Sequence, residues 1–171
     1  MSTSTLPVWT ELRGALERAT PQLLAITENV ATVRPGPGKW SCKEVIGHLI
    51  DSATNNHGRF VRAQLKDELV FEGYDQDAWM RVQRYQERAW PELVSLWREL
   101  NLQVAHVMQS MSAHDRLRTR TVHNLHQIAW KTVPESTPTT LEYFLRDYIG
   151  HMEHHLRQAA STASAANAPR A

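Results

Sequence analysis

Histidines gather in one short stretch near the carboxyl end of the sequence. The segment YIGHMEHHLRQ (148–158) contains His151, His154 and His155. On an α-helix, which turns about 100° per residue, His151 and His155 lie about 40° apart, and His154 lies about 60° away on the other side of His151. Apolar residues share the face of the first two: Leu141, Phe144, Leu145, Tyr148, Met152, Leu156 and Ala159. We therefore expect His151 and His155 to point inward together, with His154 at the surface or just behind a ligand.

Two imidazoles one helical turn apart are suited to chelating a metal ion. Their nitrogens can converge on a single ion about 2.0–2.1 Å away. Neutral imidazole is a good ligand for Zn, Ni, Cu and Fe(II). Catalytic metal sites commonly have three protein ligands and keep a further position open for water or substrate. The pair therefore predicts a third ligand elsewhere in the chain.

A third histidine in a similar position lies in the run CKEVIGHLIDSATNNHGRFVRAQL, residues 42–65. On a helix, His48 falls at the edge of the apolar arc, as the first histidine of the inward pair does on its own helix. Ser52 and Arg59 flank it on one side and Asn55 on the other. A polar seam beside an apolar face is typical of a pocket wall. The sequence thus indicates a three-histidine site between two packed helices.

A packing role is the alternative explanation for each of these histidines. A single inward histidine such as His48 is more often a hydrogen-bonded core residue than a metal ligand. Histidines at the edges of core-facing arcs, such as His151 and His155, are also common on amphipathic helices. The other histidines show no such pattern, and we expect them on the surface or in loops: His57, His106, His114, His123 and His126. His126 is the one that could reach the site, if the connection that carries it folds over the pocket.

Other well-known site motifs are missing from the sequence. HMEHH is not the HExxH motif of zinc proteases, because Glu153 stands in the third place instead of the second. There is no pair of ExxH repeats, as a di-iron carboxylate bundle needs, and no CxxC, P-loop or GxGxxG motif. Cys42 lies one residue after an expected helix cap, where a thiol pKa can be lowered. Its place on the apolar arc favours an unreactive packed thiol.

Helical periodicity and capping residues predict the elements that position these side chains. Apolar residues recur at helical spacing over residues 8–30, where Pro21 either kinks the run or opens a second piece. Ser41 and Glu44 match a capping box, which opens a helix that reaches about Leu65. This second helix carries the first of the three histidines.

Two further helices follow. One covers about residues 84–111 and has Pro91 in its first turns. The other opens at a second capping box, Thr139 with Glu142, and extends to about Ala160. Four long helices, with a long connection before the last one, favour an all-α four-helix bundle.

The remaining segments are expected to be irregular. Residues 113–138 contain short apolar-polar alternation and end with two prolines, which predicts a long connection with extended pieces. Residues 161–171 have too little apolar surface to pack. We therefore expect a bundle domain over residues 1–160, followed by a flexible tail.

Length and composition are those of an ordinary globular protein. The chain has 171 residues, 42% of them hydrophobic and 22% charged, with a formal net charge of +1. This charge gives no reason to expect binding to nucleic acid or to an anionic membrane. No window has the apolar length of a membrane span or the pattern of a signal peptide. Because a single cysteine excludes an intramolecular disulfide and fits a reducing compartment, we expect a cytoplasmic protein.

Four separated stretches carry a resemblance to a known family. They are GKWSCKEVIGHLIDS (38–52), NNHGRF (55–60), YDQDAW (74–79) and HMEHH (151–155). In order and approximate spacing they resemble the DinB-like superfamily, in particular its YfiT-type branch of metal-dependent hydrolases and thiol S-transferases. The similarity extends over about residues 6–160. The block of tryptophan, capping box and histidine, combined with the terminal HxxHH, is its most specific part.

This resemblance implies a four-helix bundle with a crossover topology and a divalent metal, Zn or Ni, held by His48, His151 and His155. It implies that the third helix bears no ligand. Asp51, Asn55 and Arg59 match polar positions that line the family's pocket. Tyr74 and Trp79 match the family's YDxxAW loop. Family members resemble thiol S-transferases that use bacillithiol or mycothiol, a mycothiol-dependent isomerase, or hydrolases. A small-molecule substrate, a low-molecular-weight thiol as cofactor and a homodimer are therefore expectations from the resemblance.

Two kinds of protein are consistent with these residues. A metal-dependent enzyme would use metal-activated water for hydrolysis or a thiolate for transfer to carbon. Arg59 would then pair with a carboxylate of the substrate or thiol, and the alternative is an ordinary surface arginine. Asp51 and Gln158 would each orient a metal ligand or simply face solvent. A non-catalytic bundle would use the metal to join two helices, with a closed site and a fourth ligand such as His126. We favour the enzyme, mainly through the resemblance, and assign no catalytic residue.

Overall fold

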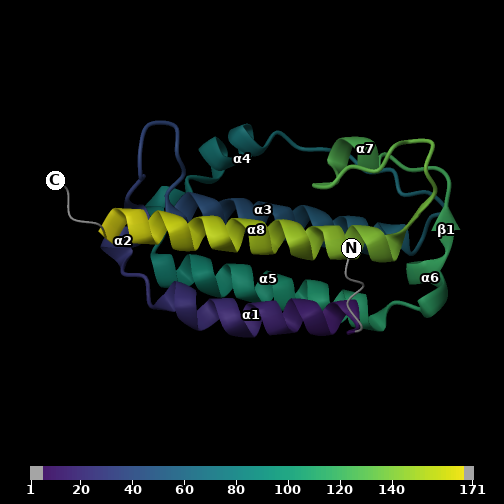
Figure 1. Ribbon diagram of the computed structural model, residues 1–171, viewed down its shortest axis with the longest axis horizontal. Helices are drawn as coiled ribbons and strands as arrows, with labels where there is room; N and C mark the ends of the chain where they lie inside the picture. Colours follow the sequence, from purple (N-terminus) through teal and green to yellow (C-terminus); the bar gives the residue numbers. More distant parts are fainter. Residues whose placement is uncertain (1–5, 168–171) are drawn as a thin grey trace.

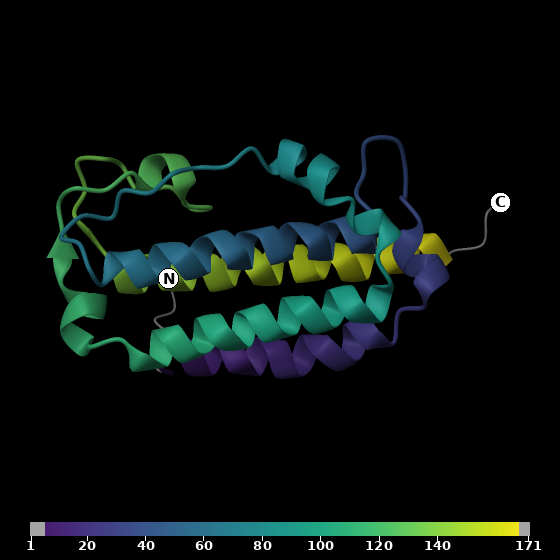
Figure 2. The same cartoon turned by 180° about the vertical axis from the view of Figure 1, so that it is seen from behind.

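Four long helices lie side by side along the long axis of the molecule (Figure 1). The computed structural model describes residues 6–167, and its long helices are α1 (Val8–Leu24), α3 (Cys42–Ala63), α5 (Trp90–Ser110) and α8 (Leu141–Asn167). α3 and α1 each pack against both α5 and α8. Figure 2 shows the same arrangement from behind, with the long connection before α8 crossing one end of the bundle. The predicted all-α four-helix bundle is confirmed.

The helix that carries the first histidine begins at the predicted capping box. Ser41 Oγ accepts from the backbone N–H of Glu44 at 3.2 Å, and Glu44 Oε2 accepts from the backbone N–H of Ser41 at 2.9 Å. These bonds satisfy two amide groups that a helix start leaves free. Every residue from Cys42 to Ala53 is buried. The first half of α3 is therefore an interior helix, and any polar side chain on it faces protein.

The first predicted helix is divided into two. α1 keeps Pro21 inside its last turn and ends at Leu24, and α2 (Glu28–Thr32) follows after a short break. Thr27 caps the second piece by accepting from the backbone N–H of Val30 at 3.4 Å. The break follows Leu24 and therefore lies after Pro21. Neither expectation, a kink at Pro21 or a second piece that opens at Pro21, describes the break fully.

The predicted start of the third helix near residue 84 is wrong. α4 (Gln76–Gln83) is capped by Arg84, whose φ of 53° lies in the left-handed region. A short 3-10 turn, η1 (Tyr85–Glu87), follows. α5 begins only at Trp90, with Pro91 in its first turn as expected. A left-handed residue interrupts the helical hydrogen bonding, which separates α4 from α5.

The predicted cap of the last helix is displaced by one residue. Thr140 Oγ1 accepts from the backbone N–H of Tyr143 at 3.2 Å, and Thr139 and Thr140 together form a short strand before the helix. Glu142 pairs instead with Arg116 at 2.8 Å and with Arg146 at 2.6 Å. The predicted Thr139–Glu142 capping box is therefore wrong, because strand pairing and two arginines compete for these residues.

The last helix is longer than expected. α8 continues to Asn167, and Thr162 and Ala163 are buried in its final turns, where α2 packs against α8. The predicted end near Ala160 is wrong, because alanine-rich sequence favours helix and small side chains suffice to pack there, so residues 161–167 are helical. Residues 168–171 of the predicted tail lie outside the described residues.

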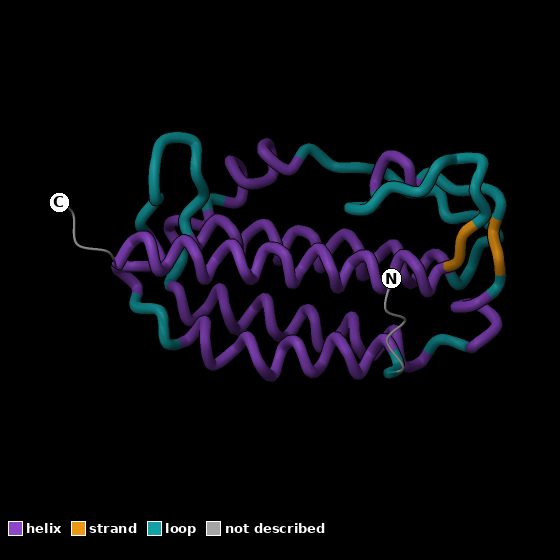
Figure 3. The backbone as a smooth tube through the Cα atoms, in the orientation of Figure 1, coloured by secondary structure: helices purple, strands orange, loops and turns teal. Residues whose placement is uncertain are grey.

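The long connection before α8 contains the extended pieces that were expected. It includes α6 (Ala113–Leu117), β1 (Thr119–Arg120), α7 (Leu125–Ile128) and β2 (Thr139–Thr140), shown by type in Figure 3. β1 and β2 pair antiparallel. The two ends of the connection are thereby joined beside the start of α8.

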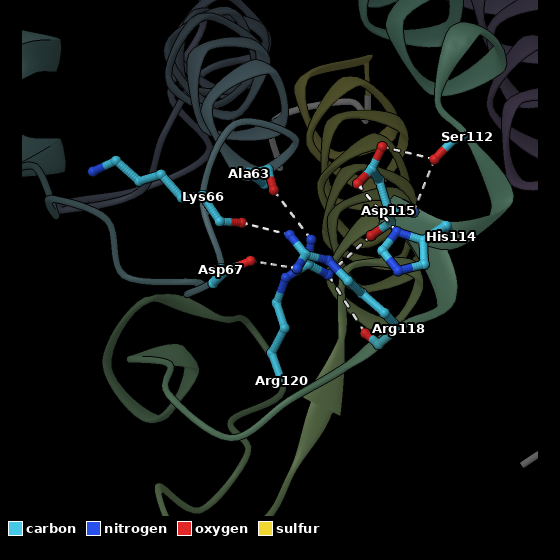
Figure 4. A network of polar contacts seen from close by, with 8 residues as sticks. All are labelled: Ala63, Lys66, Asp67, Ser112, His114, Asp115, Arg118 and Arg120. Atoms are coloured by element: carbon cyan, nitrogen blue, oxygen red, sulfur yellow. Dashed lines mark hydrogen bonds and ion pairs between the residues drawn. The ribbon is translucent and has the colours of Figure 1, made fainter.

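A buried arginine fixes this connection to the end of α3 (Figure 4). Arg120 donates to the backbone carbonyl of Ala63 at 3.1 Å and to that of Asp115 at 2.9 Å. Arg118 donates to the backbone carbonyl of Lys66 at 2.7 Å. These bonds satisfy carbonyls that a helix end leaves free. Among residues 6–167, no helix combines the length and the apolar character that crossing a bilayer requires.

Candidate metal centre

The three predicted histidines meet at the contact between α3 and α8. His48 projects from α3, and His151 and His155 project from α8. One ring nitrogen of each lies within 4.8 Å of those of the other two. The Nε2 atoms of His48 and His151 are 3.2 Å apart, and the His155 ring centroid lies 4.6 Å from each of the other two centroids. The helical spacing thus selected side chains that the fold brings together.

The separation of these nitrogens fits a shared metal ion. Two nitrogens that are each about 2.0–2.1 Å from one ion lie about 2.9–3.4 Å apart for octahedral to tetrahedral angles. The 3.2 Å between Nε2 of His48 and Nε2 of His151 falls within that range. The Nδ1 atom of His48 is buried and has no hydrogen-bond partner among the described residues. An ion bound at its Nε2 would offset the cost of burying this poorly bonded ring.

The local environment keeps these imidazoles neutral. Burial, together with weaker repulsion by neighbouring histidines, lowers the pKa of His48 to about 4 and that of His151 to about 3. Burial also lowers the pKa of His155, although its hydrogen bond with Gln158 opposes this shift. At neutral pH all three rings are therefore uncharged, with a lone pair on one nitrogen. That is the form in which histidine binds metals.

Gln158 orients one of the three rings. The Nδ1 atom of His155 lies 2.7 Å from Gln158 Oε1, an oxygen that only accepts, so Nδ1 carries the proton. Nε2 of the same ring is then left with its lone pair. The alternative in which Gln158 faces solvent is wrong. His154, by contrast, is exposed and packs against the Trp130 ring at 5.4 Å, outside the trio as its position on the helix predicts.

A small cavity adjoins the histidines. It has a volume of about 150 Å³, and α3, α7 and α8 all contribute to its wall. Its lining consists of Ser52, Asn56, Ile128, Ala129, Trp130, Phe144, Asp147, Tyr148 and His151. The predicted pocket wall beside the apolar face of α3 is present, but Asn56 occupies it instead of Asn55. Asn55 is half-buried and donates to the backbone carbonyl of Asp51 at 2.9 Å.

Two tryptophans that the sequence did not assign to the site flank it. The Trp40 ring lies 5.3 Å from that of His48, and the Trp130 ring lies 6.3 Å from that of His151. Trp40 immediately precedes the capping box of α3, a signal that could have placed it there. Trp130 belongs to the long connection, and no local pattern reveals its position. A Cβ added at Gly150 would lie 3.1 Å from the Trp130 ring, so the glycine gives this ring room.

The other predicted polar residues are buried but serve different partners. Asp51 accepts from the Tyr85 hydroxyl at 2.6 Å and from Gln83 at 3.2 Å, and burial raises its carboxyl pKa. It is 1% exposed, so the solvent-facing alternative is wrong. The surface alternative for Arg59 is wrong as well, since this side chain is buried. Tyr74 and Trp79 pack on each other with ring centroids 5.0 Å apart, but Trp79 lies in α4, and not in a loop as the YDxxAW resemblance implied.

The remaining candidates stay outside the metal group. His126 lies in α7 and does not join the three histidines, so the described residues provide no fourth ligand of this kind. His123 was expected at the surface or in a loop, but it is buried and bonds to the Thr137 carbonyl at 2.9 Å. Cys42 is also buried, and burial raises the pKa of its thiol to about 11. This agrees with an unreactive packed thiol.

Comparisons with known proteins give a family and a fold. The sequence profile of the DinB superfamily matches residues 8–159. The fold is similar to that of YfiT from Bacillus subtilis, with a TM-score of 0.72 and 19% sequence identity, covering 95% of this chain and 89% of the other. That protein is described as "a probable metal-dependent hydrolase with an unusual four-helix bundle topology". No curated protein sequence gives a significant match.

Proposed function

The chain belongs to the DinB superfamily, and from that premise we propose that it is a metal-dependent enzyme that acts on a small molecule. The observation that carries the proposal is the meeting of three neutral imidazoles, from His48, His151 and His155, on one point between α3 and α8. Three nitrogen ligands suit Zn²⁺ or Ni²⁺ and leave room in the coordination shell.

The cavity supports a catalytic role over a purely structural one. One of the three histidines, His151, forms part of its wall, so a molecule in the cavity lies beside the metal position. A structural zinc site usually closes with a fourth protein ligand. The described residues provide three ligands only. This arrangement favours an ion that is accessible to a substrate.

The ion would supply Lewis acidity, which makes a water molecule or a thiol more acidic. Both hydrolysis and thiol S-transfer are compatible with that chemistry. The protein's own residues supply positioning: Gln158 orients His155, and the polar residues Ser52 and Asn56, which are bonded to each other, line the cavity. Asp147 lines the cavity too, but its two oxygens accept from the backbone N–H groups of Trp130 and Lys131 at 2.9 and 2.8 Å. It therefore holds the cavity wall in place.

Metal content tests the proposal. Untagged protein, loaded with Zn²⁺ or Ni²⁺ and dialysed, is expected to retain about one ion per chain by elemental analysis. His48→Ala, His151→Ala and His155→Ala are expected to lose it, whereas His154→Ala, with its exposed side chain, retains it. Wild-type protein that retains no ion would refute the proposal.

A spectroscopic experiment separates the enzyme from a structural metal site. Protein loaded with Co²⁺ is titrated with azide or with 2-mercaptoethanol. A ligand that reaches an open position changes the visible absorption of the ion. An unchanged spectrum with both ligands would favour the non-catalytic bundle, in which the metal only joins two helices.

A further inference from the structure

Arg59 is a buried positive charge without an opposite charge beside it. Its side chain is 5% exposed. It donates to Asn56 Oδ1 at 3.3 Å and to the backbone carbonyl of Glu72 at 2.6 Å. Both acceptors are neutral, and Arg59 has no ion pair with any carboxylate of the described residues. A buried charge in this condition is strongly unfavourable unless something else compensates it.

The other buried arginine differs from Arg59 in the charges that surround it. Arg120 is also buried, and burial and the neighbouring Arg118 lower its pKa, but the carboxylates of Asp115 and Asp67 lie close enough to oppose part of this shift. Burial lowers the pKa of Arg59, the Tyr74 phenol alone opposes that shift, and the guanidinium of Arg62 adds to it. Arg120 thus has carboxylates nearby that offset part of the cost of its burial, whereas no carboxylate acts on Arg59 in this way.

The position of Arg59 connects it with the cavity. His48, Ser52, Asn56 and Arg59 are spaced by four, four and three residues, so they follow one face of α3. Ser52 and Asn56 line the cavity together with His151. Asn56 also accepts the hydrogen bond from Arg59, so the guanidinium lies directly beside a residue of the cavity wall.

A second hydrogen-bond donor lies near the guanidinium. The Tyr74 hydroxyl makes no hydrogen bond within the described part of the chain, and it is close enough to Arg59 for each to influence the other's pKa. It also raises the pKa of Tyr148, which lines the cavity. A guanidinium has five N–H donors, and Arg59 uses two in the bonds described above. Unused donors therefore gather beside the cavity. The carboxyl of Asp51 is close enough to raise the pKa of Tyr74, but its hydrogen bonds go to Tyr85 and Gln83.

We propose that Arg59, assisted by Tyr74, binds the carboxylate of a small acidic substrate whose other end lies at the three histidines. This inference rests on the proposed function and adds the class of substrate to it. The planar guanidinium matches a carboxylate through two parallel hydrogen bonds. His48 and Arg59 lie eleven residues, or about 16 Å, apart along α3, so the acidic group and the reacting group belong to opposite ends of the substrate.

Hexanoate and hexanamide test the proposal, because they differ in charge but hardly in shape. Each is titrated by calorimetry into the full-length protein after treatment with a chelator, so that the carboxylate cannot coordinate an ion. We expect hexanoate to bind at least about tenfold more tightly, the effect of one charge-assisted hydrogen-bonded pair. R59Q is expected to reduce this preference to below about threefold. R62Q removes the same charge from an exposed position on the same helix and keeps the preference.

Equal binding of the two probes by the wild type, or an unchanged preference in R59Q, would overturn the proposal. Arg59 would then only hold the backbone at Glu72. If R59Q does not fold by circular dichroism, R59K replaces it, since lysine keeps the charge and loses the forked geometry. A preference reduced by about threefold or more supports the proposal, and an unchanged one overturns it. Metal content is measured on a separate portion of the same preparation that is loaded with Zn²⁺ or Ni²⁺ instead of treated with the chelator. A protein that retains no metal there but still prefers hexanoate would refute only the proposed function.

Discussion

Gln158 determines which nitrogen of His155 faces the other two histidines. Its Oε1 accepts from Nδ1 at 2.7 Å and leaves Nε2 as the donor of a lone pair. Neither His48 nor His151 has an equivalent carboxamide or carboxylate partner among the described hydrogen bonds. Partners of this kind commonly affect metal affinity as well as ring orientation. The site is thus more firmly ordered at one ligand than at the other two.

Replacing Gln158 is therefore expected to weaken metal binding without abolishing it. Gln158→Ala frees the His155 ring to rotate and to exchange its proton between nitrogens, and we expect a loss of about 10- to 100-fold in affinity. Competition with a chromophoric chelator measures this directly. Arg157→Ala, at the exposed neighbouring position, is the matched control and keeps wild-type affinity. Equal affinities in the two variants would contradict the orienting role of Gln158.

The lowered histidine pKa values predict a pH dependence of stability in the metal-free protein. In the folded state the pKa of His48 is about 4 and that of His151 about 3, against an ordinary value of 6.5. At pH values between the folded-state pKa and the ordinary pKa of 6.5, the unfolded chain binds more protons than the folded one. The free energy of unfolding therefore falls as pH falls below about 6.5. Each such histidine contributes at most about 1.4 kcal/mol per pH unit.

Urea unfolding at pH 5, 6 and 7 checks this dependence. We expect a smaller pH slope in His151→Gln, which has one fewer group that takes up a proton on unfolding. His154→Gln changes an exposed histidine of the same helix and is expected to keep the wild-type slope. A wild-type slope in His151→Gln would show that this imidazole is not buried in the neutral form.

At the scale of elements, close approach of η1 to α3 fixes the buried carboxylate of Asp51. The Tyr85 ring lies against Gly47, where an added Cβ would be 2.2 Å from the ring. This approach brings the Tyr85 hydroxyl to 2.6 Å from Asp51 Oδ1. A side chain at position 47 would force the ring away, because both groups are buried.

Gly47→Ala is therefore expected to destabilise the fold although alanine is the better helix former. Overpacking of this kind costs about 1–3 kcal/mol. Gly58→Ala on the same helix meets only the flexible end of Arg62, so it is expected to be neutral or to stabilise by up to about 1 kcal/mol. Chemical denaturation of both variants measures the difference, and equal stabilities would show that the Tyr85 ring can move at little cost.

The whole molecule combines features that local sequence predicts with others that it does not. The direction in which a side chain leaves a helix depends only on its spacing from neighbours in the sequence, so spacing alone placed His48, His151 and His155 on inward faces. The capping box likewise placed the start of α3 correctly. Whether these histidines bind a metal remains a proposal. Capping at Thr140 escaped prediction because the strand pairing of Thr139 depends on residues far away in the sequence.

The burial of Arg59 and the position of Trp130 also depend on distant segments. Arg59 is covered only when the chain around Glu72 returns to α3. Trp130 reaches the site because Asp147, on α8, accepts from the backbone N–H groups of Trp130 and Lys131. Periodicity describes one helix at a time and carries no information about such contacts.

The tryptophans beside the histidines have an optical consequence. The chain has six tryptophans, and the rings of Trp40 and Trp130 lie 5.3 and 6.3 Å from those of His48 and His151. Paramagnetic ions such as Ni²⁺ and Cu²⁺ quench the emission of indoles close to them. Occupation of the site by either ion would dim the light from these two rings more than that from Trp97 in the bundle core. The protein thus carries an intrinsic fluorescent reporter for the proposed metal site, with no attached dye.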